Sequence, residues 1–333
     1  MRTLTARELV ELVPMRDAVE LMKAVFERAS AGETLSPLRT PIDMPDGSGV
    51  TLYMPAYVPQ TTLAPAATGA KIVSVFTGNP ERGLPTINAI VIMIDPATGV
   101  PLGIIEGGSL TALRTGAVSG AATDLLARRD SRVLTVIGAG AQGVTQAAAV
   151  AAVRDIEVIY PVDLNPESVA SFAERLAGWD EQAAGLVQTG KSAKEAVRAA
   201  DVICTATTSK RPVFEDEWVR PGTHVNGVGA YTPEMQEIPT GLVQRARIVV
   251  DQIEAALHEA GDLIQPIQRG ELDRENVTTE LGHLVAGSVT GRSDDDDITF
   301  FKSVGNAIQD MIVGGLALQR AEERGIGATI ELT

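Results

Sequence analysis

The stretch Val133-Leu-Thr-Val-Ile137 runs directly into Gly138-Ala-Gly140-Ala-Gln-Gly143, and an alanine-rich segment follows. The apolar, β-branched run predicts a buried strand, and the alanine-rich segment predicts a helix. Between them, Gly138 permits a tight turn, Gly140 lets the backbone approach a pyrophosphate, and Gly143 lets the helix pack close to the strand. The N–H groups at the start of the helix would bind the phosphates. The stretch therefore predicts a Rossmann-type dinucleotide site.

An acidic residue, Asp163, follows 20 positions beyond the last of these glycines, at the end of the strand-like run 157–162. A carboxylate there accepts hydrogen bonds from the ribose hydroxyls and repels a 2′-phosphate. No Lys or Arg follows it directly, since the next residues are Leu164 and Asn165. The sequence therefore favours NAD(H) over NADP(H). The alternative, that Asp163 caps the next helix, is less favoured because Asn165 before Pro166 suits that position.

The arrangement of strands differs between two parts of the chain. From residue 133 to 251, strand-like runs alternate with helical segments, which predicts βαβ crossovers and a parallel sheet. The first third instead places strand-like runs one after another, which predicts an antiparallel or mixed sheet. These runs are Val50–Met54, Ala70–Phe76, Ile87–Asp95 and Pro101–Glu106.

Helical spacing covers residues 4–31, 110–128 and 300–324. We expect the last helix to leave the parallel-sheet region and to pack on the first part of the chain. The sequence thus predicts an α/β fold with a Rossmann NAD-binding domain, residues 119–309. A discontinuous α+β domain, residues 1–118 and 310–333, is expected to bind the substrate.

Composition narrows the class of protein. The chain has 333 residues, which suggests two domains, and its 28 basic and 43 acidic side chains give a net charge of −15. This charge argues against a nucleic-acid or anionic-membrane partner. Residues 1–13 lack the apolar core of a secretory signal, and no stretch approaches the ~20 apolar residues that span a bilayer. The single cysteine, Cys204, excludes an intrachain disulfide. We expect a cytoplasmic protein.

Three cations of the N-terminal region lie in apolar or turn-rich contexts: Lys71 within a strand-like run, Arg114 near a helix start, and Arg39 between two prolines. Cations are rarely buried unless they are paired. Each could form a salt bridge with a nearby carboxylate, or together they could bind a substrate carboxylate. Lys71 is the candidate for proton transfer, provided that burial and the neighbouring arginines lower its pKa.

Other catalytic constellations are missing from the sequence. No HExxH motif occurs, and His224, His258 and His283 do not share the spacing of metal ligands, so we expect no metal site. No G-x-S-x-G elbow occurs either. We interpret Cys204 as a buried, inert thiol and the four carboxylates of Asp294–Asp297 as a solvated loop.

Seven motifs, in this order, resemble the ornithine cyclodeaminase/mu-crystallin family, which includes archaeal-type alanine dehydrogenases and cyclic ketimine reductases. They are Gly69-Ala-Lys71, Gly83-Leu-Pro-Thr86, Leu113-Arg-Thr-Gly-Ala117, Val136-Ile-Gly-Ala-Gly-Ala-Gln142, Val225-Asn-Gly-Val-Gly229, Glu259-Ala-Gly-Asp262 and Ile298-Thr-Phe-Phe-Lys-Ser-Val-Gly305. The resemblance implies a homodimer built through the sheet of the first domain.

The resemblance also implies roles for single residues. Arg39, Lys71 and Arg114 would line the carboxylate pocket, with Val304 near the substrate. The expected dinucleotide contacts are Thr86, Arg114, Ala141, Gln142, Asp163, Val228 and Ser303, beside the glycine turn.

One position departs from the family. Ornithine cyclodeaminases carry an aspartate just after a Val-Gly-Gly type turn, where it orients the amine and exchanges protons. Here the turn reads Val228-Gly-Ala-Tyr231-Thr-Pro233, so Tyr231 replaces the acid. A phenol with a pKa near ~10 cannot act as a carboxylate base, although it can donate a hydrogen bond or form a wall of the pocket. The replacement disfavours cyclodeamination of ornithine.

The sequence thus favours an NAD(H)-dependent oxidoreductase acting on the C–N bond of a small α-amino or cyclic α-imino acid. The reference pairs are proline with Δ1-pyrroline-2-carboxylate, and alanine with pyruvate and ammonia. Two alternatives stay open: an ornithine or lysine cyclodeaminase that recycles bound NAD, and a non-catalytic ligand-binding protein of the mu-crystallin type.

Overall fold

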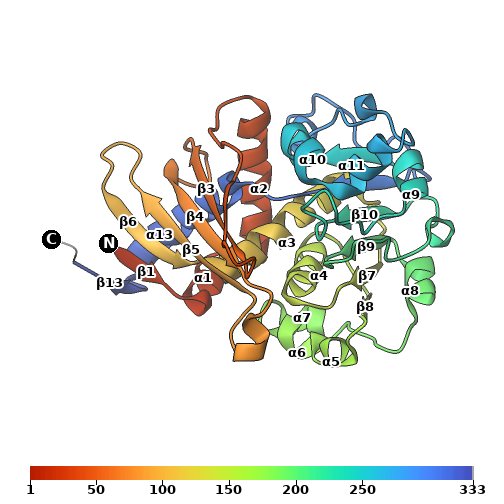
Figure 1. Cartoon of the computed structure of the whole chain (residues 1–333), viewed down its shortest axis with the longest axis horizontal. Coiled ribbons are helices and arrows are strands. Elements are labelled where there is room, and N and C mark those ends of the chain that lie inside the picture. Colours follow the sequence, from red (N-terminus) through yellow and green to blue (C-terminus); the bar gives the residue numbers. More distant parts are fainter. Residues whose placement is uncertain (332–333) are drawn as a thin grey trace. The chain divides into compact units, whose positions relative to one another are not determined.

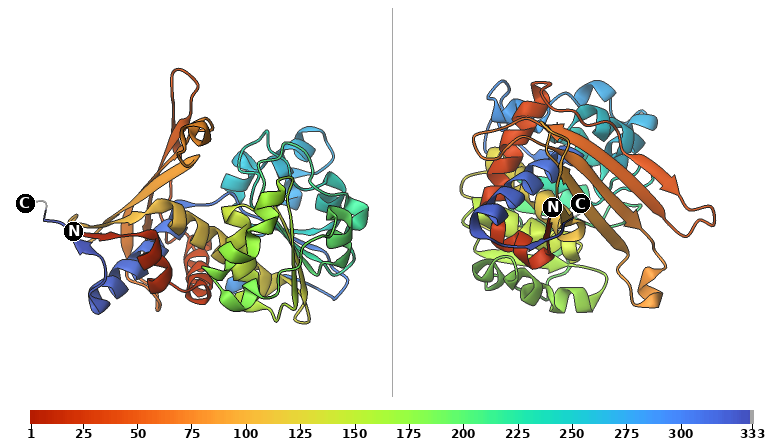
Figure 2. Two further views of the ribbon diagram at one scale, coloured as in Figure 1. Left: turned by 90° about the horizontal axis from the view of Figure 1, so that it is seen from below. Right: turned by 90° about the vertical axis from the view of Figure 1, so that its left-hand side faces the viewer.

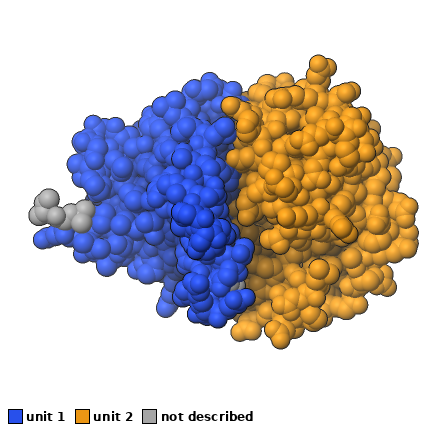
Figure 3. All heavy atoms as spheres, in the orientation of Figure 1, with its two compact units in different colours: residues 1–114, 306–333 blue, residues 115–305 orange. Residues whose placement is uncertain are grey.

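The computed structural model describes residues 1–331 and divides the chain into two compact units (Figure 3). Unit 1 comprises Met1–Arg114 and the chain from Asn306 onwards, and unit 2 comprises Thr115–Gly305. Each boundary lies four residues before the one expected from the sequence, at 118/119 and 309/310. The first falls inside one continuous helix, α3 (Gly107–Leu126), so no break in the sequence pattern marks it.

Unit 1 contains a seven-stranded sheet with the order β13-β1-β6-β5-β4-β3-β2 (Figure 1). Only β1 and β6 pair in parallel; the other neighbours are antiparallel. The four strands that the sequence predicts are the central ones, whereas β1, β2 and β13 are two to four residues long and have no clear alternation. The strands are β1 (Arg2–Leu4), β2 (Thr40–Asp43), β3 (Val50–Val58), β4 (Ala67–Val75), β5 (Ile87–Ile94), β6 (Pro101–Glu106) and β13 (Ala328–Thr329).

Helices cover one face of this sheet (Figure 2): α1 (Ala6–Leu12), α2 (Met15–Ser30) and α13 (Ala307–Arg324). The single helix expected over residues 4–31 is divided in two, because Pro14 lacks an N–H and stands at the N-cap of α2. The helix α13 lies against β3, β4 and β5, and it brings the C-terminal part of the chain onto strands of the first hundred residues.

The opposite face of the sheet carries apolar side chains. Successive residues of a strand point to opposite faces, and the register places Tyr53, Ile72 and Ile90 in one row. Tyr53 is 39 % exposed and Ile90 43 % exposed. The neighbouring row, whose side chains point to the other face, contains the buried Met54 and Val91. Within the described chain, this apolar face is covered by no helix of unit 1 (Figure 2).

Unit 2 contains a six-stranded, all-parallel sheet with the order β11-β12-β10-β9-β7-β8, flanked by helices, which confirms the predicted Rossmann fold. Its strands are β7 (Val133–Ile137), β8 (Val158–Val162), β9 (Val202–Thr205), β10 (His224–Gly227), β11 (Arg247–Val250) and β12 (Thr299–Lys302). Its helices are α4 (Ala141–Val153), α5 (Pro166–Ala170), α6 (Phe172–Ala177), α7 (Glu181–Ala184), α8 (Ala193–Ala199), α9 (Thr240–Arg245), α10 (Ile253–Glu259), α11 (Gly261–Gln268) and α12 (Leu281–Val285).

The predicted helix 300–324 is wrong at its start. The residues Thr299–Lys302 form β12, fully buried between β10 and β11, and α13 begins only at Ala307. A short apolar run with aromatic residues does not distinguish a strand from a helix by periodicity. The side chain of Asn306 accepts a hydrogen bond from Ile308 N and so fixes the start of the helix.

A row of buried polar side chains crosses the parallel sheet at its amino end. His224 contacts Thr299 Oγ1 through Nδ1 at 2.8 Å and Asn226 Oδ1 through Nε2 at 3.1 Å. Asn226 in turn donates to Thr123 Oγ1 at 2.9 Å. Burial, together with the charge of Arg292, lowers the pKa of His224 to about 3. The imidazole is therefore held neutral in the folded chain.

This histidine predicts acid-sensitive stability. Its pKa is 6.5 unfolded and about 3 folded, so only the unfolded chain takes up the proton as pH falls below 6.5. We expect a loss of up to about 1.4 kcal/mol of unfolding free energy per pH unit from this group. Urea unfolding between pH 6.5 and 5 should show a smaller slope in His224→Asn than in the exposed control His258→Asn. Equal slopes would contradict the assignment.

Candidate functional site

The glycine turn lies at the switch point of the parallel sheet. The strand β8 lies on one side of β7, and β9 and β10 follow on the other side. In sheets of this kind, ligands bind outside the carboxyl ends of the strands where the order reverses. The turn follows β7 directly, so the sequence places it at the position where this rule expects a cofactor.

The backbone of the turn fits a dinucleotide. Gly138 has a φ of +98°, which side-chain-bearing residues rarely adopt, and a Cβ there would lie 2.5 Å from the carbonyl oxygen of Ala206. A Cβ at Gly143 would lie 2.0 Å from the carbonyl oxygen of Gly138. Over Gly140, by contrast, a Cβ would meet no atom within 4 Å. Gly140 is the N-cap of α4 and no side chain caps this helix, so the open helix start suits a pyrophosphate.

Asp163 stands directly after β8 and is bonded to the glycine turn. Its Oδ2 accepts a hydrogen bond from Ala139 N at 2.7 Å, and its Oδ1 accepts one from Asn165 N at 2.9 Å. The cap of α5 is Asn165, whose side chain accepts from Glu167 N. Asp163 therefore has its predicted place beside the turn, where a carboxylate can accept hydrogen bonds from a ribose.

The other residues of unit 2 that were expected around the ligands lie at the start of α4 or in loops after strands. Ala141 is exposed and Gln142 half-buried in the first turn of α4, and Val228 is buried after β10. Ser303 follows β12, and its hydroxyl donates to Asp251 Oδ2 at 2.8 Å. Val304 N donates to the same oxygen. All of these belong to unit 2.

Two further predicted site residues are Tyr231, in unit 2, and Thr86, in unit 1. Tyr231 is half-buried after the β10 loop and packs against the apolar core of unit 2. Thr86 belongs to unit 1, where its carbonyl accepts a hydrogen bond from Phe76 N just before β5. The contacts of Tyr231 and Thr86 with ligands stay predictions.

Unit 1 brings Lys71 and Arg114 together around one buried carboxylate that the sequence analysis missed, Asp310. Lys71 Nζ, from β4, lies 2.8 Å from Asp310 Oδ2, and Arg114 Nε, from α3, lies 3.3 Å from Asp310 Oδ1. Asp310 stands in the first turn of α13. The exposed fractions are 1 % for Lys71, 7 % for Arg114 and 0 % for Asp310. An acidic residue within the apolar face of this helix was the signal in the sequence.

Burial and the neighbouring charges set the pKa of Lys71. Burial, together with the charges of Arg114 and Arg39, lowers the pKa of Lys71 to about 8, against the opposing charge of Asp310. One carboxylate thus stands among three cationic side chains, of which Arg39 is half-buried. Lys71 and Arg114 thus form the salt bridge that was one alternative from the sequence, and the binding of a substrate carboxylate stays a prediction.

A glutamine completes the cluster. Arg114 Nη1 donates to Gln309 Oε1 at 2.7 Å, which fixes the guanidinium. Gln309 is buried, and its Nε2 has no hydrogen-bond partner among residues 1–331. A buried donor without a partner is costly unless a ligand or water accepts from it. The cluster therefore has the charge and the donors that a small carboxylate needs.

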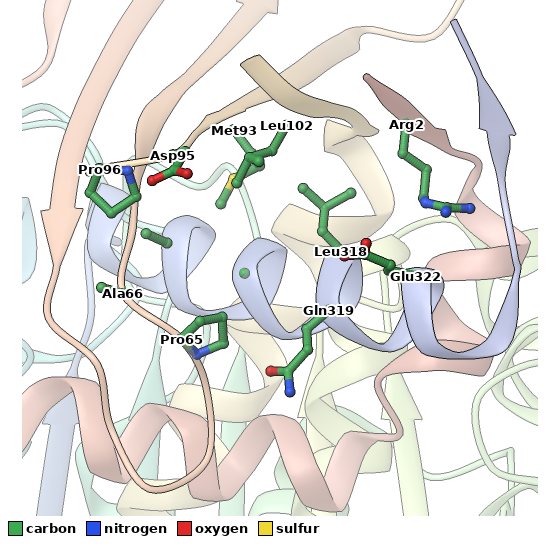
Figure 4. A pocket seen from close by; sticks show the side chains of 12 residues that line it. Arg2, Pro65, Ala66, Met93, Asp95, Pro96, Leu102, Leu318, Gln319 and Glu322 are labelled. Carbon is green, nitrogen blue, oxygen red and sulfur yellow. The ribbon is translucent and has the colours of Figure 1, made fainter. Parts of the chain in front are cut away.

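A pocket of about 360 Å³ in unit 1 lies elsewhere (Figure 4). It is lined in part by Gly315, Leu318 and Glu322, which stand on α13 about 8 to 18 Å beyond Asp310 at 1.5 Å per residue. Its lining includes two carboxylates, of Asp95 and Glu322, and one guanidinium, of Arg2, so the pocket does not suit an organic acid.

No cluster of three or more His, Cys, Asp or Glu side chains is arranged to bind a metal ion within residues 1–331. None of the helices described is long and apolar enough to cross a membrane.

Comparisons with known proteins identify the family of the chain. The sequence model of the ornithine cyclodeaminase/mu-crystallin family matches residues 2–325. A Δ1-pyrroline-2-carboxylate reductase of Bacillus cereus is 39 % identical, over 99 % of this chain and 100 % of the relative. The structure of Thermococcus litoralis Δ1-pyrroline-2-carboxylate reductase with NADH and L-proline aligns with a TM-score of 0.92, 39 % identity, and coverage of 99 % and 100 %. An archaeal alanine dehydrogenase dimer with bound NAD aligns with a TM-score of 0.90, 33 % identity, and coverage of 100 % and 99 %.

The buried cluster predicts a large effect of removing its acid. Asp310→Ala leaves two cations buried without their carboxylate, and we expect it to lower the free energy of unfolding by about 3–5 kcal/mol. The control is Asp17→Ala, because Asp17 forms an ion pair with Arg320 at the surface, 2.7 Å apart. That change should cost less than about 1 kcal/mol. Similar urea midpoints for both variants would argue against the cluster.

Proposed function

The chain belongs to the ornithine cyclodeaminase/mu-crystallin family, and on that premise we propose that it is an NAD(H)-dependent reductase of a small cyclic α-imino acid. The preferred pair is Δ1-pyrroline-2-carboxylate and L-proline, and alanine with pyruvate and ammonia is the second candidate. We further propose that the chain acts in the cytoplasm as a homodimer. The single observation that carries the reaction is the buried cluster in which Lys71 and Arg114 share one carboxylate, that of Asp310.

The cofactor choice is supported by the residues around the glycine turn. The open start of α4 suits a pyrophosphate, and Asp163 disfavours a 2′-phosphate at the adjacent ribose. NADH, when bound, supplies the hydride that reduces the imine carbon. The Bacillus cereus relative and the Thermococcus litoralis structure, both Δ1-pyrroline-2-carboxylate reductases, support the choice of substrate.

In the proposed reaction, Arg114 and Arg39 bind the substrate carboxylate and orient the C=N bond. Gln309 holds the guanidinium of Arg114, and its free amide N–H group is a further donor for the acid. Arginine can hold a carboxylate through two parallel hydrogen bonds, which fixes the orientation of the substrate as well as its position. Such positioning can lower the barrier by several kcal/mol.

Lys71 is proposed to supply the proton. Reduction of an imine adds a hydride to carbon and a proton to nitrogen, so an acid must stand near the nitrogen. With its pKa lowered to about 8, the ammonium of Lys71 can release a proton near neutral pH and regain it afterwards. Asp310 keeps the ammonium in place. In the oxidative direction the neutral amine would accept the proton.

This role predicts opposite pH dependences for the two directions. The turnover number for reduction of Δ1-pyrroline-2-carboxylate should fall as pH rises through about 8, because Lys71 loses its proton, and that for oxidation of L-proline should rise. Lys71→Met should lower both by about 10²-fold or more, whereas the surface variant Lys191→Met should not. The assay follows NADH absorbance.

Three outcomes would redirect the assignment. Unchanged turnover in Lys71→Met would remove Lys71 from the mechanism. Release of ammonia from ornithine without net change in NADH would favour a cyclodeaminase. Binding of NADH without turnover of any amino or imino acid tested would favour a ligand-binding protein.

The apolar face of the unit 1 sheet supports the proposed homodimer. A row of apolar side chains on an uncovered sheet face commonly marks a protein interface. The row includes Tyr53, Ile72 and Ile90. The structurally similar archaeal alanine dehydrogenase is described as a dimer. The buried free thiol of Cys204 fits the reducing cytoplasm that we propose.

The dimer predicts a sensitive position at the centre of this face. Ile90→Asp should convert a species of twice the chain mass into one of a single chain, because a charge would be buried without a partner. Val289→Asp, at a similarly exposed apolar side chain of unit 2, is the matched control. Sedimentation velocity measures both. An unchanged mass for Ile90→Asp would place the interface elsewhere.

A further inference from the structure

Three buried charged residues of unit 2 have no part in the chemistry proposed above: Glu237, Asp262 and Lys302. Each is fully buried: Glu237 lies between β10 and α9, Asp262 in the first turn of α11, and Lys302 at the end of β12. Burying three charged groups in one cluster costs free energy unless their geometry and hydrogen bonds are nearly ideal. The hydrogen bonds of the cluster show what this geometry holds in place.

The Glu237 carboxylate binds two loops at once. Its Oε1 accepts from Thr207 N at 2.6 Å, in the loop that follows β9. Its Oε2 accepts from Gly229 N at 2.7 Å and from Ala230 N at 3.0 Å, in the loop that follows β10. One side chain therefore sets the separation of the two loops at neighbouring strand ends.

Glu237 is itself held from behind. Asp262 Oδ1 accepts from Glu237 N at 2.7 Å and from Ile238 N at 2.9 Å. Asp262 Oδ2 accepts from Lys302 Nζ at 2.8 Å. Burial and the charge of Asp262 raise the pKa of Glu237, while the charge of Lys302 opposes this rise. The lysine thus allows two carboxylates to stand side by side in the protein interior.

The loop after β9 also touches the glycine turn. A Cβ at Gly138 would lie 2.5 Å from the Ala206 carbonyl oxygen and 2.9 Å from Thr207 Cγ2. Thr207, in the loop after β9, therefore lies between the glycine turn and the loop after β10. Asp163, which suits the adenosine ribose, follows β8 on the other side of β7.

A dinucleotide extends across the carboxyl edge of a Rossmann sheet, over the switch point. With its adenosine half on the β8 side, its nicotinamide half lies over the ends of β9 and β10. We propose, on the basis of the proposed function, that Glu237 is a positioning residue for the nicotinamide half of the cofactor. It acts through the backbone of Thr207, Gly229 and Ala230, and its support is the pair formed by Asp262 and Lys302.

Glu237→Gln tests this role with little change in volume. A carboxylate has two acceptor oxygens, whereas the amide has one, so its NH₂ group must face a backbone N–H of one of the two loops. We expect NADH to bind at least about ten-fold more weakly, as when a buried donor loses its acceptor. ADP-ribose, which lacks the nicotinamide ring, should bind within about two-fold of the wild type. Titration calorimetry measures both affinities.

The exposed neighbour Glu234 supplies the control, and Glu234→Gln should leave both affinities unchanged. A second variant, Gly229→Ala, disturbs the same bridge from the loop side. Its Cβ would lie 2.2 Å from the Thr207 carbonyl oxygen and 2.5 Å from Glu237 Oε1. Gly229→Ala should weaken the binding of NADH but not that of ADP-ribose. If Glu237→Gln does not fold, Gly229→Ala provides the test of the positioning role.

The outcomes separate the two proposals. Equal weakening of NADH and ADP-ribose would make Glu237 a general structural residue and overturn this inference, and so would unchanged NADH affinity. Wild-type protein that binds neither ligand would contradict the proposed function itself. Selective loss of NADH affinity supports the positioning role even if the substrate proves to be a different acid.

Discussion

The ion pair between Lys71 and Asp310 is the interaction on which the candidate active site depends. A lysine that is 1 % exposed cannot stay charged in the protein interior without an anion close by, and Asp310 supplies that anion from α13. Arg114 shares the same carboxylate. Because this carboxylate pairs with two buried cations, it offsets much of the cost of burying them, and in the proposed mechanism the same cluster binds an organic acid.

The ion pair between Lys71 and Asp310 also influences the pKa of Lys71. If Lys71 were exposed, its pKa would be near 10.5 and the ammonium would be a poor acid at neutral pH. If it were buried without Asp310, the charged form would be disfavoured further, because the opposing interaction would be lost. Burial together with a carboxylate places the pKa at about 8, in the range where a group can both give and take a proton. Binding and proton transfer thus depend on one arrangement of side chains.

Much of the fold and part of the site could be predicted from the sequence, where the signal is local. The turn that begins at Gly138 lies between a strand and a helix, and each glycine has a separate steric reason to be there. Lys71 stands out because it interrupts an apolar strand. The position of Asp163 follows from the length of one βαβ unit.

The rest depends on contacts between distant segments. Asp310 meets Lys71 across 239 positions of sequence, and α13 otherwise has the pattern of an ordinary buried helix. Most of the strand Thr299–Lys302 was expected to be helical, because the short run Thr299-Phe-Phe301 carries no periodicity. Glu237 lies in a turn-rich segment without a motif, and only the folded chain brings its carboxylate to Thr207 and Gly229.

The central claim is that the cluster around Asp310 holds the carboxylate of the substrate. Titration calorimetry of the NADH-loaded protein with L-proline and with L-prolinamide tests it directly, since the two ligands differ in whether the acid carries a charge. The account predicts that L-proline binds at least about 100-fold more tightly, as expected when charged hydrogen bonds to a buried cationic site are lost. Equal affinities for the two ligands would contradict it.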